Sequence, residues 1–141
     1  MSTTIYVEHA NKAFRKATKD YKRLIDSIKN YPEVNHEQFN VEIHLADEKG
    51  SNTSYLFIYG YKISINMTLI LGESNEYLGR VLCRLANEGE QVAELYIDEH
   101  GSLKKDESAE YPSGYLGDCG KENTATKFLK TLAKNLLNKK Q

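Results

Sequence analysis

Several residue types and patterns that would place a protein in a particular class are rare in this sequence. Its 141 residues include two cysteines, two prolines and no tryptophan. The cysteines, Cys83 and Cys119, are far apart and form no CxxC pair, so we expect free thiols. No apolar run approaches the roughly 20 residues of a membrane span. The opening stretch MSTTIYVEH has neither the basic nor the apolar region of a signal peptide, so we expect a cytoplasmic protein without membrane contact.

The sequence also lacks a recognisable metal-binding pattern. Its four histidines, His9, His36, His44 and His100, are scattered along the chain. Nothing matches HExxH, paired CxxC or a calcium-binding loop. We therefore expect no metal and no other cofactor.

The composition that is present is typical of one globular domain. Hydrophobic residues make up 40% and charged residues 28% of the chain, which is long enough to bury a core without metals or disulfides. We expect a single domain over 1–141. The net charge of −1 conceals an uneven distribution, because residues 1–31 hold seven Lys or Arg against three acids. Residues 124–141 hold five lysines and no acid, so the centre of the chain is acidic.

Helical periodicity marks both ends of the chain. Near the N-terminus, apolar residues recur every three or four positions, at Val7, Ala10, Phe14, Ala17, Tyr21, Leu24 and Ile28. Pro32 cannot continue this helix, so it should end near Asn30, whereas TTIYV before it would also suit a strand. A second helix is predicted over about 124–138, with Asn123 or Thr124 as its N-cap.

Between these helices the sequence predicts strands. Val41, Ile43 and Leu45 alternate with polar residues, and further strands are expected near 54–59, 62–71, 91–98 and 102–104. The odd positions from 55 to 71 are apolar, and one strand of that length would be too long for a small domain. Gly60 should therefore mark a tight turn or a bulge.

The segment 75–88 has two interpretations. As a helix it has Leu78, Val81, Leu82 and Leu85 on one face; as a strand it alternates Val81, Cys83 and Leu85 with arginines. The fold class predicted in either case is α+β, with both terminal helices on one face of an antiparallel sheet of about four to six strands. A helix at 75–88 would give the order α-β-β-β-α-β-(β)-α, which is similar to the order in secretion chaperones for exported effectors.

The stretch YPSGYLGDCGKENTATKFLK, residues 111–130, is the part that most suggests chemistry. Its GxxGxxG spacing differs from the dinucleotide pattern GxGxxG. A phosphate-binding P-loop ending at Gly120-Lys121 would require glycine at Tyr115 and a hydroxyl at Glu122. We therefore interpret it as a loop that leads into the last helix.

Cys119 is a weak candidate for a catalytic residue. A helix N-terminus and the neighbouring Lys121 would each lower the pKa of its thiol, whereas Asp118 would raise it. A thiol nucleophile also needs a base, commonly histidine, at a position that this sequence does not reveal. A small thiol enzyme centred on Cys119 is the third functional hypothesis.

The basic N-terminal helix suggests nucleic-acid binding as an alternative function. The residues that could follow a phosphate backbone are Lys12, Arg15, Lys16, Lys19 and Arg23. The isoelectric point of about 6.4 and the acidic centre of the chain argue against it.

The leading hypothesis is a small non-enzymatic protein that binds another protein as an immunity or antitoxin-like inhibitor or a chaperone-like adaptor, and acidic groups around its tyrosines would favour a basic partner. The chain has ten tyrosines, which offer rigid apolar area with a polar tip. Tyr55, Tyr59 and Tyr61 share the phase of the core, but a register flip at Gly60 would turn one group to solvent. The expected binding residues are Tyr55, Tyr59, Tyr61, Glu94, Tyr96, Asp98 and Glu99, in a monomer or homodimer.

Overall fold

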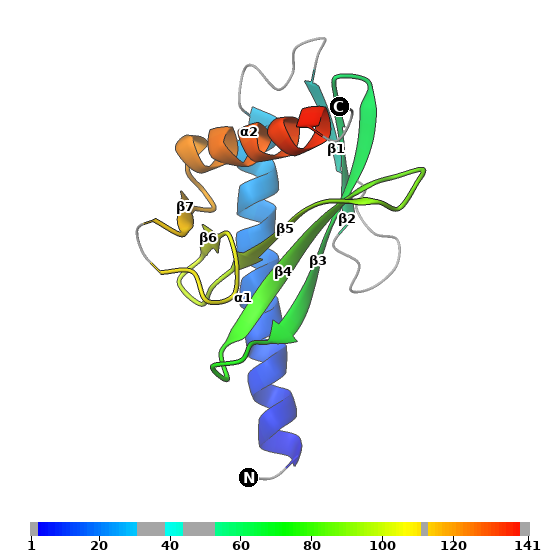
Figure 1. The fold of residues 1–141 in the computed structure, drawn as a ribbon. Helices are drawn as coiled ribbons and strands as arrows, with labels where there is room; N and C mark the ends of the chain where they lie inside the picture. Colours follow the sequence, from blue (N-terminus) through cyan, green and yellow to red (C-terminus); the bar gives the residue numbers. More distant parts are fainter. Residues whose placement is uncertain (1–2, 31–38, 44–52, 111–112, 139–141) are drawn as a thin grey trace.

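The computed structural model describes residues 3–30, 39–43, 53–110 and 113–138 (Figure 1). The elements follow one another as α1 (Thr3–Asn30), β1 (Phe39–Ile43), β2 (Thr53–Ile58), β3 (Tyr61–Leu71), β4 (Tyr77–Leu85), β5 (Gln91–Ile97), β6 (Ser102–Lys104), β7 (Tyr115–Asp118) and α2 (Glu122–Asn138). The predicted α+β class is confirmed.

The strands form one sheet in which spatial order equals chain order, from β1 to β7. Every neighbouring pair is antiparallel. In the described part of the chain the sheet therefore has seven strands, more than the four to six expected. The unexpected strand is β7, which lies in the stretch interpreted from sequence as a loop and pairs with β6.

Both helices pack on the same face of this sheet. α1 runs along the strands, and α2 crosses α1 near the C-terminal end of that helix (Figure 1). The apolar stripe of α1 and that of α2 meet the inward residues of the strands in one core. Its largest fully buried side chains include Leu24, Ile28, Leu56, Ile63, Ile65, Met67, Leu103, Phe128 and Leu132. Burial of these stripes, rather than helix propensity, stabilises both helices.

The predicted turn at Gly60 is confirmed. Tyr59 and Gly60 have φ of 48° and 85°, and Ile58 pairs with Tyr61 across a two-residue hairpin. The turn changes which positions face the core: the buried side chains are even-numbered in β2 and odd-numbered in β3. Tyr55 consequently lies on the face away from the helices, whereas Tyr61 packs against the core.

The segment 75–88 forms a strand, so the helical interpretation is wrong. β4 pairs with β3 along its whole length and with β5 on its other side. The backbone hydrogen bonds of these two long neighbours outweigh a local helical periodicity. Among the described residues the order of elements is thus α, seven strands, α, and the similarity in order to secretion chaperones does not hold.

The sequence predicted the end of α1 correctly but not the start of α2. α1 ends at Asn30 as expected and includes the ambiguous TTIYV. α2 begins at Glu122, so the prediction of Asn123 or Thr124 as N-cap is wrong. The amides of Thr124 and Ala125 donate to the carbonyl of Lys121 instead. Thr124 lies inside the first turn, and its buried hydroxyl has no hydrogen-bond partner among the described residues.

Candidate functional site

A cleft of about 600 Å³ opens between the N-terminal half of α1 and two turns of the sheet. One turn joins β3 to β4, and the other joins β5 to β6. The lining residues are His9, Lys12, Ala13, Lys16, Ala17, Leu69, Ser74, Asn75, Glu76, Tyr77, Asp98 and Glu99. We call this feature the α1 cleft.

The α1 cleft combines an apolar floor with a rim of both charges. Ala13, Ala17 and Leu69 supply small and branched apolar groups. Lys12 and Lys16 belong to the helix wall, and the opposite wall carries Glu76 and Glu99 on the turns. A surface of this kind offers apolar area for contact and charges that select the orientation of a bound partner.

Local hydrogen bonds hold the β5–β6 turn that forms part of this wall. Asp98 is buried, and its Oδ1 accepts hydrogen bonds from the backbone amides of His100 at 2.9 Å and Ser102 at 3.0 Å. Burial, together with a hydrogen bond to Asp98, raises the pKa of Tyr115. Asp98 is thus a structural residue of the turn, and it leaves its neighbour Glu99 exposed to solvent.

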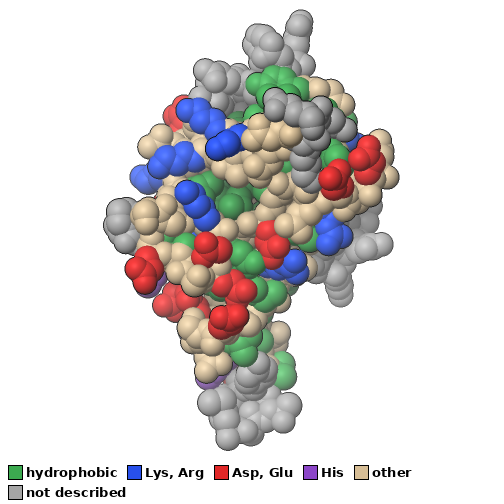
Figure 2. Space-filling view, in the orientation of Figure 1, with side chains coloured by type: hydrophobic (Ala, Val, Ile, Leu, Met, Phe, Trp, Pro, Cys, Tyr) green, Lys and Arg blue, Asp and Glu red, His purple; other side chains and the backbone are tan. Residues whose placement is uncertain are grey.

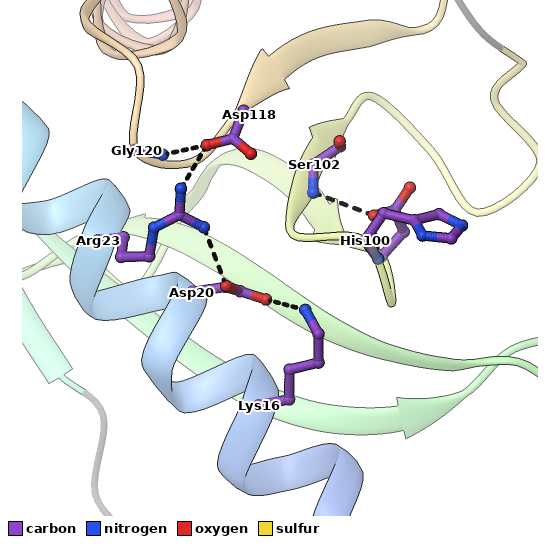
Figure 3. Close-up of polar contacts among 8 residues, drawn as sticks. Lys16, Asp20, Arg23, His100, Ser102, Asp118 and Gly120 are labelled. Carbon is purple, nitrogen blue, oxygen red and sulfur yellow. Dashed lines mark hydrogen bonds and ion pairs between the residues drawn. The ribbon is translucent and has the colours of Figure 1, made fainter.

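Ion pairs link three side chains of α1 and connect this helix to the turn before α2. Asp20 is buried and accepts hydrogen bonds from Lys16 Nζ at 2.8 Å and Arg23 Nη1 at 3.2 Å. Arg23 Nη2 also lies 2.6 Å from Asp118 Oδ1. Figure 3 shows Asp20 between Lys16 and Arg23, with Arg23 reaching towards Asp118. Of these contacts, that of Arg23 with Asp118 joins α1 to another part of the chain.

The same ion pairs weaken the argument for nucleic-acid binding by the basic residues of α1. All five candidate nucleic-acid residues, Lys12, Arg15, Lys16, Lys19 and Arg23, are exposed on α1. The charges of Lys16 and Arg23, however, are balanced by carboxylates of this chain. The structure therefore does not present five unbalanced cations for phosphate groups.

The three candidate tyrosines around Gly60 do not share one surface. Tyr55 lies on the outer face of the sheet, where Lys62 Nζ is 4.6 Å from its ring centroid and 5.8 Å from that of Phe57. Tyr59 is exposed at the tip of the hairpin, and Tyr61 is partly buried against the core. The register flip separates these side chains.

Glu94 and Tyr96 form a hydrogen-bonded group on the outer face of β5. Glu94 Oε1 accepts from the Tyr96 hydroxyl at 2.5 Å and from Arg80 Nε at 2.7 Å. These two contacts, that of Tyr96 first, lower the pKa of Glu94. Burial first and Glu94 second raise the pKa of Tyr96 to about 12. Tyr96 is buried, so this pair does not form the exposed acidic surface that was expected.

Cys119 lacks the environment of a nucleophile. Its side chain is buried, and burial first and the Asp20 carboxylate second raise the pKa of the thiol to about 12. Cys83 is also buried, with its pKa raised to about 12 by burial. Both cysteines are free thiols, as predicted. A helix N-terminus or a neighbouring cation can lower the pKa of a thiol. Here the pKa of Cys119 is raised, although Lys121 and the start of α2 follow it closely in the chain.

Metal-ligand clusters are not found in the described part of the chain, where no three His, Cys, Asp or Glu side chains could hold an ion together. His9 lines the α1 cleft, and His100 is exposed with Nε2 3.6 Å from Glu99 Oε1. His36, His44 and the predicted strand residue Leu45 lie outside the described residues.

The structure brings together residues from two separate predictions and adds others. Asp98 and Glu99, predicted for protein binding, line the same cleft as Lys12 and Lys16, predicted for nucleic acid. The β3–β4 turn at 72–76, together with Tyr77 at the start of β4, was not predicted as part of a site. Its sequence GESNEY signals a turn, with Asn75 at φ 61°, but gives no sign that α1 lies beside it.

Comparisons with known proteins give no family. The chain matches no protein-family model, and neither a curated protein nor a solved structure is significantly similar to it. Within residues 3–30 and 122–138, no helix is long and apolar enough to cross a membrane.

Proposed function

We propose that the protein is a non-enzymatic binding protein that docks a partner protein in the α1 cleft and acts as an inhibitor or adaptor. The observation that carries this proposal is the apolar floor of Ala13, Ala17 and Leu69 between walls of opposite charge. A partner segment that fits it carries an apolar centre, acidic groups towards Lys12 and basic groups towards Glu76 and Glu99. Such a pattern orients a protein partner more readily than a uniformly anionic one.

Two titratable groups of the cleft, Lys16 and Asp98, are held by contacts within this chain, which favours a binding role for them over acid–base catalysis. Lys16 is paired with Asp20, and Asp98 is occupied by the amides of its own turn. A general acid or base needs a proton that it can exchange with a substrate, and these groups already have structural partners. The buried, free thiols of Cys83 and Cys119 are in keeping with a reducing, cytoplasmic location.

The distribution of surface charge favours a partner whose own surface carries both signs of charge. Figure 2 shows many acidic side chains in the lower half of this face and Lys and Arg side chains at the upper left, where Figure 1 places α2. Separated patches of opposite sign steer a partner of complementary pattern and speed its association.

A photo-crosslinking residue placed at Ala13 tests this function. Lys130, exposed on α2 and outside the cleft, is the matched control position. We expect a covalent adduct with one protein from position 13, weakened when Lys12→Glu reverses the charge of the exposed helix wall, and no such adduct from position 130. Equal capture at both positions would refute docking in the cleft.

A salt titration separates protein binding from the nucleic-acid alternative. Binding of a single-stranded oligonucleotide that is tight and falls steeply with salt, and that Lys12→Glu abolishes, would favour nucleic acid. We expect weak binding that Lys12→Glu and the α2 control Lys130→Glu change equally.

A further inference from the structure

The outer face of the sheet, which is the face away from the helices, carries two aromatic rings side by side on β2. Tyr55 and Phe57 both point away from the core, because the buried side chains of this strand are the even-numbered ones. Residues two positions apart on a strand are separated by about 7 Å. Both side chains are half-buried, so part of each ring is open to solvent. The two rings thus offer neighbouring surfaces for flat groups.

Two cations lie beside these rings and have no carboxylate partner among the described residues. Lys62 Nζ on β3 is 4.6 Å from the ring centroid of Tyr55 and 5.8 Å from that of Phe57. Arg84 on β4 is exposed and stands in the same cross-strand row as Tyr55, with Ser64 between them. The two strand spacings between Tyr55 and Arg84 amount to about 10 Å. We call Tyr55, Phe57, Lys62 and Arg84 the outer-face patch.

The charges around the patch indicate which side of the rings an anion would prefer. Further along β4, Arg80 Nε donates to Glu94 at 2.7 Å, so these two charges balance one another. In β1, Glu42 stands opposite Tyr55 in the register. The positive charge without a partner therefore lies over β3 and β4, and a phosphate backbone should follow these strands rather than β1.

We propose that the outer-face patch binds single-stranded nucleic acid, with bases on the rings of Tyr55 and Phe57 and phosphates beside Lys62 and Arg84. Bases of any sequence stack on aromatic side chains, because every base has a flat π face. Lys62 is exposed, so its ammonium can move from the ring faces to the phosphate between two stacked bases. Because the patch has only two cations, we expect weak binding, with a dissociation constant in the micromolar range or above.

This contact is separate from the α1 cleft. The patch lies on the face of the sheet opposite the helices, whereas Lys12 and Ala13 belong to α1. A protein partner in the cleft and a nucleic-acid strand on the outer face use different residues, so either proposal can fail without the other. Lys12→Glu should change oligonucleotide binding no more than the control Lys130→Glu does.

The stacking part is tested by fluorescence anisotropy with an oligothymidylate of about 12 nucleotides and an abasic strand of equal length. Phe57→Leu removes the ring but keeps an apolar side chain, and should weaken oligothymidylate binding about fivefold or more. Phe14→Leu is the matched control, because Phe14 is also half-buried but lies on α1. Equal binding of both strands by the natural chain would overturn the proposal. That comparison needs no variant, so it decides even if Phe57→Leu fails to fold.

The charged part is tested by measuring oligothymidylate binding across salt concentrations. Lys62→Gln and Arg84→Gln should each lower the slope of log affinity against log salt by about 0.7, since each removes one phosphate contact from a single strand. Lys130→Gln, on α2, should leave the slope unchanged. Polyglutamate carries negative charge without bases and should compete poorly. Competition as strong as that of the oligothymidylate would overturn nucleic acid in favour of an acidic protein segment.

Discussion

Arg23 and Asp118 lie 95 residues apart in the chain, yet Nη2 of the guanidinium is 2.6 Å from Oδ1 of the carboxylate. The same guanidinium donates to Asp20, and Asp118 also accepts from the amide of Gly120. This contact ties the middle of α1 to the turn that leads into α2. It relates the two terminal helices, which the sequence could identify but could not place.

The ion pairs of this chain should differ in their contribution to stability. The side chains of Arg23 and Asp118 are 45% and 36% exposed, so Asp118→Ala should cost no more than about 1 kcal/mol. Asp20 is buried with two charged donors, and Asp20→Ala should cost about 1–3 kcal/mol. Urea unfolding of both variants checks the order. Equal losses would mean that the exposed pair is as important as the buried carboxylate.

Gly101 should tolerate alanine less well than Gly89. Both have φ in the left-handed region, at +81° and +72°, so alanine strains each by about 1 kcal/mol. A Cβ on Gly101 would also stand 3.1 Å from Oδ1 of Asp20, whereas one on Gly89 meets nothing within 4 Å. The unfolding free energy of Gly101→Ala should therefore fall further. If both variants lose the same amount, the carboxylate of Asp20 moves aside without cost.

The two buried thiols should lower the free energy of unfolding at alkaline pH. Burial raises the pKa of Cys83 and of Cys119 from 9.0 to about 12, so between these values the native state keeps protons that the unfolded state has released. The stabilisation is fully present below pH 9 and is lost as pH rises towards 12. Urea midpoints across this range should fall, and fall less in Cys119→Ala. A thiol reagent should react slowly with the native protein, and rapid reaction would contradict the burial of both side chains.

Part of the fold could be predicted because it depends on residues that lie close together in the sequence. Gly60 marks the hairpin, and the three-four spacing from Val7 to Ile28 marks α1. The segment that forms β4 carries both periodicities, because Leu78 and Leu82 fit a helical face while Cys83 fits alternation. Pairing with β3 and β5 decides between them, and such pairing is not visible in the segment itself.

The α1 cleft depends on contacts between distant parts of the chain, which single-sequence patterns do not contain. Lys16 meets Asp20 one helical turn away, but Glu76 and Glu99 line the same cleft only because α1 passes beside the turns that follow β3 and β5. Likewise Tyr96 looked available for a partner, yet it is buried and hydrogen-bonded to Glu94. Charge and aromatic content indicated a binding protein but not where the binding groups meet.

Tyr59 offers a test of the hairpin. It adopts φ of 48°, which is costly for tyrosine and readily accepted by asparagine in a two-residue turn before glycine. Tyr59→Asn should raise the free energy of unfolding by up to about 1 kcal/mol. Calorimetric melting checks this expectation. A lower melting temperature would show that contacts of the tyrosine ring outweigh the backbone strain.

Thr124 should be a position where removing a hydroxyl stabilises the protein. Its Oγ1 is buried and has no hydrogen-bond partner among the described residues, so the folded state bears the cost of its desolvation. Thr124→Val keeps the branched shape and removes that cost, which should raise the free energy of unfolding by about 1 kcal/mol. Thr126→Val is the matched control in the same helix, because the exposed Thr126 hydroxyl donates to the Glu122 carbonyl at 3.1 Å. Both variants replace threonine by valine in one helix, so their difference in urea midpoint compares a buried hydroxyl without a partner with a hydrogen-bonded one. The space beside Thr124 is tight, since a Cβ on Gly117 would lie 2.5 Å from Oγ1. A loss of stability in Thr124→Val would therefore mean that the added methyl volume outweighs the relief of the unpaired hydroxyl.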